Sequence, residues 1–266
     1  MRLLVLLLAA ALGLAACQTT TTTVVDGQVV AQTSGPSANA PRENAERARA
    51  RLQLAAAYYR NGQLGIALEE GKRAFELDPR QAATLGFLGL VYNDLGERTQ
   101  AEDSFRRALA IEPANPDLNN NYGWFLCRNA QQRESIQYFE RAARDPLYAT
   151  PARALQNAGA CLAAIKDWSG AAGLLKRAFE IEPGNPSVLY DATRVAIASG
   201  DAERAVFYYQ LLSRDGENSA PVLWLGVRTA RVAGDARTES RRARELNQKF
   251  PDSPEARRLQ RGDFND

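Results

Sequence analysis

The sequence repeats with a period of 34 residues, and this period limits the available folds more than any other feature. Pro79 and Pro113 lie 34 residues apart, and Pro183 and Pro251 lie twice that distance apart. A fixed period of this size is typical of an array of small structural units, each burying its apolar face against its neighbours. We therefore expect a solenoid.

Small and large apolar residues alternate within each unit as two closely crossing helices require. The clearest unit, residues 82–115, has Gly89, Ala101 and Ala108 at small positions and Phe105 between them. The period and the pattern match the tetratricopeptide repeat (TPR), a helix–turn–helix unit. Its first helix is called A and its second helix B.

Six such repeats fill the predicted domain at residues 42–253, so the predicted fold is an all-α, right-handed α-solenoid. The predicted repeats cover residues 48–81, 82–115, 116–151, 152–185, 186–219 and 220–253. The third has two extra residues near Pro146, and the sixth is degenerate. Gly62, Gly96, Gly200 and Gly234 fall at the A–B turns, where a positive φ is required. Residues 254–266 are predicted to form a short polar cap, which terminal repeats need.

The composition excludes common catalytic chemistry. The 266 residues include no histidine and three cysteines, so Ser-His-Asp and Cys-His catalysis, His-containing metal sites and a Cys₄ metal site are excluded. A net charge of +2 argues against a nucleic-acid partner. Because the repeats leave no residues for a catalytic domain, we predict that the protein is not an enzyme. We expect no cofactor, no metal and no small-molecule substrate.

The N-terminus has the pattern of a targeting segment. Residues 3–14 are an apolar run that is too short to span a membrane and has the length of a signal-peptide core. Residues 14–17, Leu-Ala-Ala-Cys, resemble the bacterial lipobox, in which the cysteine is acylated. We therefore predict a lipoprotein signal peptide at residues 1–16 and lipidation of Cys17. The alternative is an ordinary secretory signal with an incidental cysteine.

The residues after Cys17 bear on the destination of the protein. In lipoproteins of Gram-negative bacteria an aspartate after the cysteine commonly causes retention at the inner membrane, but this chain has Gln18. That resemblance implies a lipid-anchored protein of the outer membrane, facing the periplasm. Residues 17–41 are rich in Thr, Ser, Gly and Gln and are predicted to be a flexible tether.

Side chains on the A helices of a TPR array line its concave face. The positions expected to point into it carry aromatic, amide and arginine side chains, which suit an extended or helical peptide. The candidate groove residues are Asn93, Asp94, Asn120, Trp124, Arg128, Gln156, Tyr190, Arg194, Trp224 and Arg228. The alternative is that these are ordinary helix-surface residues, with Trp124 and Trp224 packing against neighbouring repeats.

The other two cysteines lie one repeat apart. Cys127 and Cys161 fall in the A helices of the third and fourth repeats. In an oxidising periplasm a nearby pair is expected to form a disulfide, which would fasten these repeats together. Two buried thiols are the alternative.

Three motifs resemble one family in particular. They are NNYGWFLC at residues 120–127, DPLY at residues 145–148 and NAGAC at residues 157–161. Together with the lipobox and six TPRs, they resemble the type IV pilus biogenesis lipoproteins called PilF or PilW. The resemblance implies a pilotin, a lipoprotein that brings the secretin PilQ to the outer membrane and assembles it into a ring. It also places the family's acylated cysteine at Cys17 and its cysteine pair at Cys127 and Cys161.

Two other functions are compatible with the sequence. The first is a periplasmic TPR lipoprotein adaptor for peptidoglycan hydrolases or for outer-membrane protein assembly. The second is a histidine-free enzyme, for instance a carboxylate-pair hydrolase, which would need a catalytic domain that the repeats do not leave room for. The partners expected from the resemblance are PilQ or other type IV pilus proteins, with the outer membrane held through the acyl anchor.

Overall fold

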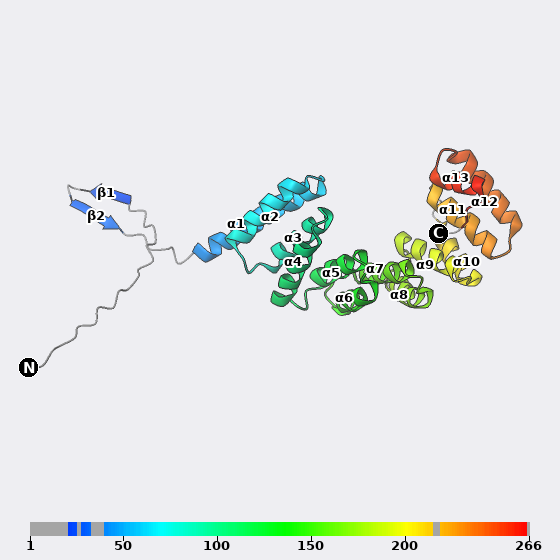
Figure 1. Cartoon of the computed structure of the whole chain (residues 1–266), viewed down its shortest axis with the longest axis horizontal. Coiled ribbons are helices and arrows are strands. Elements are labelled where there is room, and N and C mark those ends of the chain that lie inside the picture. The colour runs from blue at the N-terminus through cyan, green and yellow to red at the C-terminus, as the bar shows by residue number, and fades with distance from the viewer. Residues whose placement is uncertain (1–20, 26–27, 33–39, 215–218, 265–266) are drawn as a thin grey trace, which may run out of the picture.

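A computed structural model of the chain describes residues 21–25, 28–32, 40–214 and 219–264. Helices in antiparallel pairs make up the array (Figure 1). They are α1 (Ala40–Arg60), α2 (Leu64–Leu77), α3 (Ala82–Asp94), α4 (Arg98–Ile111), α5 (Pro116–Arg128), α6 (Gln132–Arg144), α7 (Pro151–Ala164), α8 (Trp168–Ile181), α9 (Pro186–Ala198), α10 (Ala202–Leu212), α11 (Ala220–Val232), α12 (Ala236–Lys249) and α13 (Pro254–Arg261). The predicted all-α solenoid of A and B helices is confirmed, with α1 to α12 forming six pairs.

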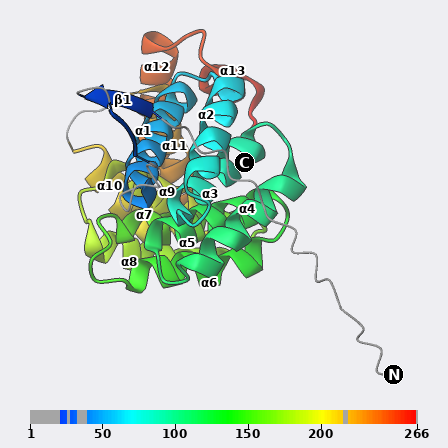
Figure 2. The ribbon, with the colours of Figure 1, turned by 90° about the vertical axis from the view of Figure 1, so that its left-hand side faces the viewer.

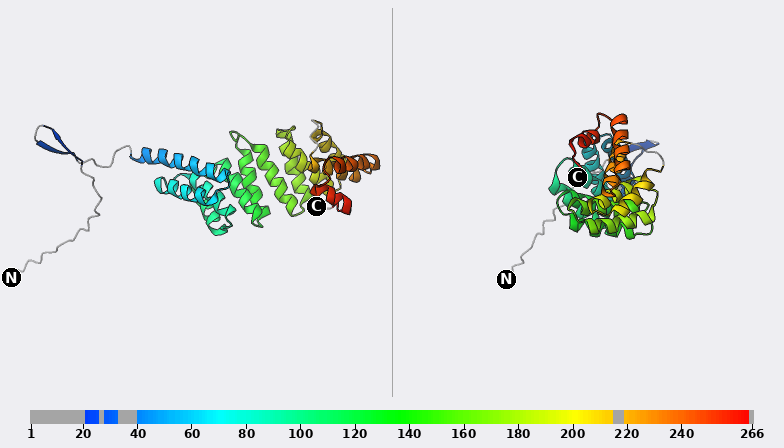
Figure 3. Two further views of the ribbon diagram at one scale, coloured as in Figure 1. Left: turned by 90° about the horizontal axis from the view of Figure 1, so that it is seen from above. Right: turned by 90° about the vertical axis from the view of Figure 1, so that its right-hand side faces the viewer.

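The odd-numbered helices α1 to α11 are the A helices, and they form the inner side of the coil. Within the described residues, the backbones of successive A helices approach one another closely, whereas successive B helices meet through side chains, such as Arg177 of α8 with Glu140 of α6 and Phe179 of α8 with Phe207 of α10. Viewed along the array, α3, α5, α7 and α9 lie toward the inside and α4, α6, α8 and α10 toward the outside (Figure 2). Seen from above, the pairs follow one another along the long axis (Figure 3).

The A–B turns have the backbone conformation that the sequence predicted. Gly96 has φ +80°, and the glycines at three equivalent turns also have positive φ. The third and fourth repeats use Ala130 (φ 64°) and Lys166 (φ 59°) at this position instead. Both residues adopt a left-handed backbone conformation that is rare for residues other than glycine. The packing of the helix pair therefore imposes the turn geometry even where glycine is absent.

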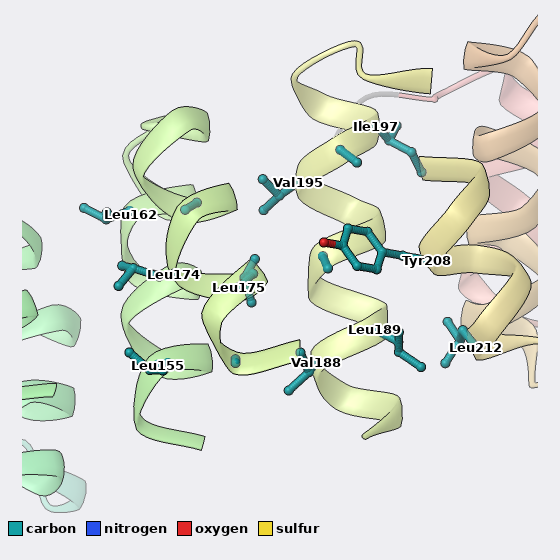
Figure 4. Packing of buried hydrophobic residues seen from close by; sticks show 14 of the residues in the cluster. Leu155, Leu162, Leu174, Leu175, Val188, Leu189, Val195, Ile197, Tyr208 and Leu212 are labelled. Carbon is teal, nitrogen blue, oxygen red and sulfur yellow. The ribbon is translucent and has the colours of Figure 1, made fainter. Parts of the chain in front are cut away.

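In the second, third and fourth repeats, a large side chain of the B helix packs against a glycine of the A helix. An added Cβ at Gly89 would lie 2.9 Å from the Phe105 ring, and one at Gly159 would lie 2.7 Å from Leu175 Cγ. Phe105 and Leu175 are almost fully buried. Figure 4 shows Leu175 among the side chains packed between α7, α8 and α9 in the largest apolar cluster. Close helix crossing therefore depends on these glycines.

The N-terminal region differs from the predicted tether. β1 (Thr21–Val25) pairs antiparallel with β2 (Gln28–Gln32), with Val25 opposite Gln28, and α1 begins at Ala40. Runs of Thr and Val favour strands because β-branched side chains suit a pleated surface, and an Asp-Gly dipeptide lies between them in the sequence. The prediction of a flexible tether over residues 17–41 did not include these strands, and it placed the start of the repeat domain two residues after the start of α1. The predicted signal peptide and Cys17 lie outside the described residues.

The predicted short polar cap contains the helix α13, whose inner face is apolar. α13 folds back onto α11 and α12. Ala256 is fully buried there, and Leu259 and Phe264 pack against the cluster formed by Leu223, Trp224 and their neighbours. The last repeat thus covers its apolar face with the end of the same chain. No helix in the described ranges combines the length and apolar character needed to cross a bilayer.

Candidate functional site

Polar side chains join successive A helices along the concave face. The Tyr59 hydroxyl on α1 donates to Oδ2 of Asp94 on α3 at 2.5 Å. Further along, Nδ2 of Asn157 on α7 donates to Oδ1 of Asn120 on α5 at 3.1 Å, and Nε2 of Gln156 donates to Oδ2 of Asp191 on α9 at 2.8 Å. We call these three pairs the polar ladder. Because each joins one repeat to the next, they fix the concave wall as a preformed surface.

Two members of the polar ladder have shifted pKa values. Burial, together with the hydrogen bond to Asp94, raises the pKa of Tyr59 to about 12. Burial also raises the pKa of Asp191, although the hydrogen bond from Gln156 and the charge of Arg194 act in the opposite direction. The Tyr59 hydroxyl therefore remains a donor at any physiological pH, whereas burial disfavours the charged form of Asp191.

The shift at Asp191 predicts a pH-dependent stability. Its folded-state pKa lies above the unfolded value, so its contribution to stability is fully present below the ordinary aspartate pKa of about 3.9 and is lost as the pH rises through the folded value. We expect the melting temperature of Asp191→Asn, relative to the unchanged protein, to rise between about pH 3.5 and pH 7. Asp103→Asn, at an exposed carboxylate, is the control. A difference that does not change with pH would contradict the assignment.

The exposed part of the groove is centred on Trp124 and Arg128 of α5. The Trp124 side chain is 38% exposed, unlike the buried aromatic residues around it. Nη1 of Arg128 lies 3.9 Å from Oδ1 of Asp94, and the same oxygen accepts a hydrogen bond from Asn93 at 3.1 Å. The Asp94 carboxylate therefore interacts with Tyr59, Asn93 and Arg128, which belong to the first, second and third repeats. It lies on the helix next to the exposed Trp124 ring.

The remaining predicted groove residues divide into two groups. Gln156, Tyr190 and Arg194 are partly buried on α7 and α9, and Arg194 lies 3.6 Å from Asp191. Asn120 is buried, with 7% of its surface exposed, and serves the polar ladder instead of a partner.

The prediction that Trp224 and Arg228 line an open groove is wrong. Trp224 is 4% exposed and Arg228 is 5% exposed. The Trp224 ring stacks on Phe264 with centroids 5.3 Å apart, and the Arg258 guanidinium of α13 lies 5.6 Å from it. The reason is the returning C-terminal segment, which occupies the concave face of the sixth repeat. The open groove therefore runs over the second to fifth repeats.

Three ladder residues were absent from the predicted groove. Tyr59, Asn157 and Asp191 each face a partner 35 to 37 residues away. A search for pairs of complementary polar residues slightly more than one repeat apart would have identified them. Nothing in the composition marks them individually.

Cys127 and Cys161 connect α5 to α7 beside the groove. Their sulfur atoms lie 1.98 Å apart and their Cα atoms 5.8 Å apart, a Cα separation at which a disulfide can close without backbone movement. The bond would lock the third repeat to the fourth at the position of Trp124 and Arg128. Among the described residues, no group of three or more His, Cys, Asp or Glu side chains could hold a metal ion.

The disulfide is expected to stabilise the array measurably. Replacing both Cys127 and Cys161 with serine should lower the free energy of unfolding by about 2–4 kcal/mol, since a closed loop of this length restricts the unfolded chain. Urea unfolding of the double variant, compared with the oxidised protein, measures the effect. Mass spectrometry without reductant gives a separate check, and two free thiols in the mature protein would contradict the bond.

An array of helix pairs with a preformed concave groove defines a TPR protein, a class of repeat proteins. Residues 82–115, 104–137 and 162–226 each match the tetratricopeptide repeat in comparisons with protein families.

Known proteins with the same overall fold extend this assignment. The solved structure of PilW, described as a widely conserved type IV pilus biogenesis factor, is 32% identical and superposes with a TM-score of 0.72, covering 80% of this chain and 97% of that one. The solved structure of PilF from Pseudomonas aeruginosa is 27% identical, with a TM-score of 0.70 over 83% of this chain and 99% of that one. In sequence, the type IV pilus assembly protein PilF of Pseudomonas aeruginosa is 28% identical over 209 residues, 79% of this chain and 83% of the relative. The chain belongs to the PilW/PilF family of type IV pilus biogenesis TPR proteins.

Proposed function

We propose that this protein is an outer-membrane lipoprotein and a pilotin, which promotes the localisation and multimerisation of the type IV pilus secretin PilQ. It acts as a scaffold and not as an enzyme, and a segment of the secretin binds in the concave groove. The observation that carries the proposal is the exposed Trp124 beside Arg128 on a wall fixed by the polar ladder. An aromatic and an arginine side chain on a rigid surface are the residue types most often found at the energetic centre of protein interfaces.

The N-terminal sequence supports the membrane part of the proposal. An acylated Cys17 would hold the protein on the periplasmic side of the outer membrane, because acyl chains gain about 0.8 kcal/mol per buried CH₂. The segment between Cys17 and α1 would then set the reach of the groove. Anchoring raises the effective concentration of the groove near membrane-bound partners without any additional contact.

Co-purification of the acylated protein from outer membranes tests the function. We expect the secretin to be recovered with it. Recovery of peptidoglycan hydrolases or of subunits for outer-membrane protein assembly, without the secretin, would favour the adaptor function instead.

Trp124→Ala is expected to reduce secretin recovery at least tenfold while lowering the melting temperature by only a few degrees, because the ring is partly exposed. Phe207→Ala is the matched control, since this ring is 47% exposed on the B helix α10 and far from the concave face. A larger effect on the melting temperature than on recovery would mean that Trp124 is a core residue.

A further inference from the structure

The C-terminus shows how this fold binds an aromatic side chain on its concave face. The Phe264 ring stacks on Trp224 with an interplanar angle of 23°. The guanidinium carbon of Arg231 also lies over this ring, 3.4 Å from its centre. Glu239 holds that guanidinium in place, accepting a hydrogen bond from Nε of Arg231 at 2.9 Å. Trp224, Arg231 and Glu239 together form what we call the occupied seat.

The groove contains a second set of the same side chains, and none of the described aromatic rings stacks on its indole. Trp124 and Arg128 lie one helical turn apart on α5 and therefore on the same face of that helix. The Arg128 side chain is 57% exposed and faces Asp94, as Arg231 faces Glu239. Trp124, Arg128 and Asp94 are called the open seat. Both seats have an indole ring, a guanidinium and a carboxylate that orients it.

Exposed arginines on the A helices α5 and α7 favour an acidic residue in the partner segment, next to its aromatic side chain. Arg153, at the start of α7, is exposed and has no ionic partner within the described residues. Arg128 on α5 is exposed as well, so two neighbouring A helices each carry an exposed cationic side chain. The segment seated in cis also has an acidic residue, Asp263, directly before Phe264.

We propose that the open seat binds an aromatic side chain of the partner segment, with an acidic residue beside it, as the occupied seat binds Phe264. This inference rests on the proposed function, because it names the chemistry of the segment that the groove takes. Stacking on an indole and contact with a guanidinium favour an aromatic over an aliphatic side chain of similar size. The open seat should therefore prefer an aromatic side chain of the partner segment over an aliphatic one of similar hydrophobicity.

A titration with dipeptide amides tests the open seat without any secretin. N-acetyl-Asp-Phe-amide and N-acetyl-Asp-Leu-amide are added to the purified protein, and the three indole N–H resonances are followed by NMR after assignment by single Trp→Phe substitutions. We expect the Phe compound to shift the Trp124 resonance, and the Leu compound to bind roughly threefold to tenfold more weakly. Arg128→Gln should weaken the Phe compound by a similar factor, and Arg128→Lys, which keeps the charge but not the planar group, by less.

The occupied seat provides the internal control. The Trp224 resonance should not respond in the unchanged protein, and it should respond in Phe264→Ala, where the seat has been opened. The proposal is overturned if Trp124 fails to respond, whether or not Trp224 responds in Phe264→Ala, or if the Leu compound binds as well as the Phe compound. Melting temperatures of the variants show that each is folded. Because no secretin is present, failure here leaves the proposed function standing, and failure of secretin co-purification leaves this result unchanged.

Discussion

Phe105→Ala is expected to lower the free energy of unfolding by about 3–5 kcal/mol, the largest effect of any single substitution considered for this fold. The Phe105 ring is fully buried, seated on Gly89, with ring centroids 5.5 Å from Phe125 and 5.8 Å from Tyr122. Its removal would leave a cavity where α3, α4 and α5 meet, directly behind the open seat. Urea unfolding followed by circular dichroism measures the loss.

Phe207→Ala provides the control for this prediction as well. It removes the same number of atoms from a half-exposed ring, so its cost should be about 1 kcal/mol or less. Comparable losses for the two variants would mean that the seating of B-helix rings on A-helix glycines does not determine stability.

Cys17→Ala is expected to abolish membrane attachment while leaving the melting temperature of the TPR array unchanged. Without the acylated cysteine, the protein should move from the outer-membrane fraction to the soluble fraction. Secretin multimers should then be lost from the outer membrane, because the groove would no longer be concentrated there. Cell fractionation with immunodetection of secretin multimers measures both effects.

Gln18→Asp separates acylation from destination. It should leave the lipid in place but retain the protein at the inner membrane, with a similar loss of outer-membrane multimers. Normal multimers in Cys17→Ala would show that the anchor is dispensable, and unaltered sorting in Gln18→Asp would contradict the proposed route.

The repeat array follows from the sequence because its determinants are local and periodic. The spacing of Pro79 and Pro113, and glycines such as Gly96 at the turns, set the helix pairs before any long-range contact is known. The same period predicted groove positions for Trp124 and Arg128, and both side chains are exposed in the structure. Where the repeat pattern is regular, the helices and turns expected from local sequence are those of the folded protein.

The errors arise where distant segments meet. Trp224 occupies a groove position in the repeat pattern, but α13 and Phe264 return to cover it, and the pattern contains no information about that return. The polar ladder was missed for a similar reason. Whether two side chains such as Tyr59 and Asp94 come within hydrogen-bonding distance depends on the rotation between successive repeats, which the sequence pattern does not give. The β1–β2 hairpin has a local sequence basis in its Thr and Val runs, which a compositional reading as a tether overlooked.

Site-specific photo-crosslinking in living cells tests the central claim most directly. A benzoylphenylalanine placed at position 124, on the concave face, is compared with one placed at position 207, on the outer helix α10. We expect a covalent adduct between the secretin and the protein crosslinked through position 124, and none through position 207. Adducts of equal yield from both positions, or adducts from position 124 that contain only other proteins, would contradict it.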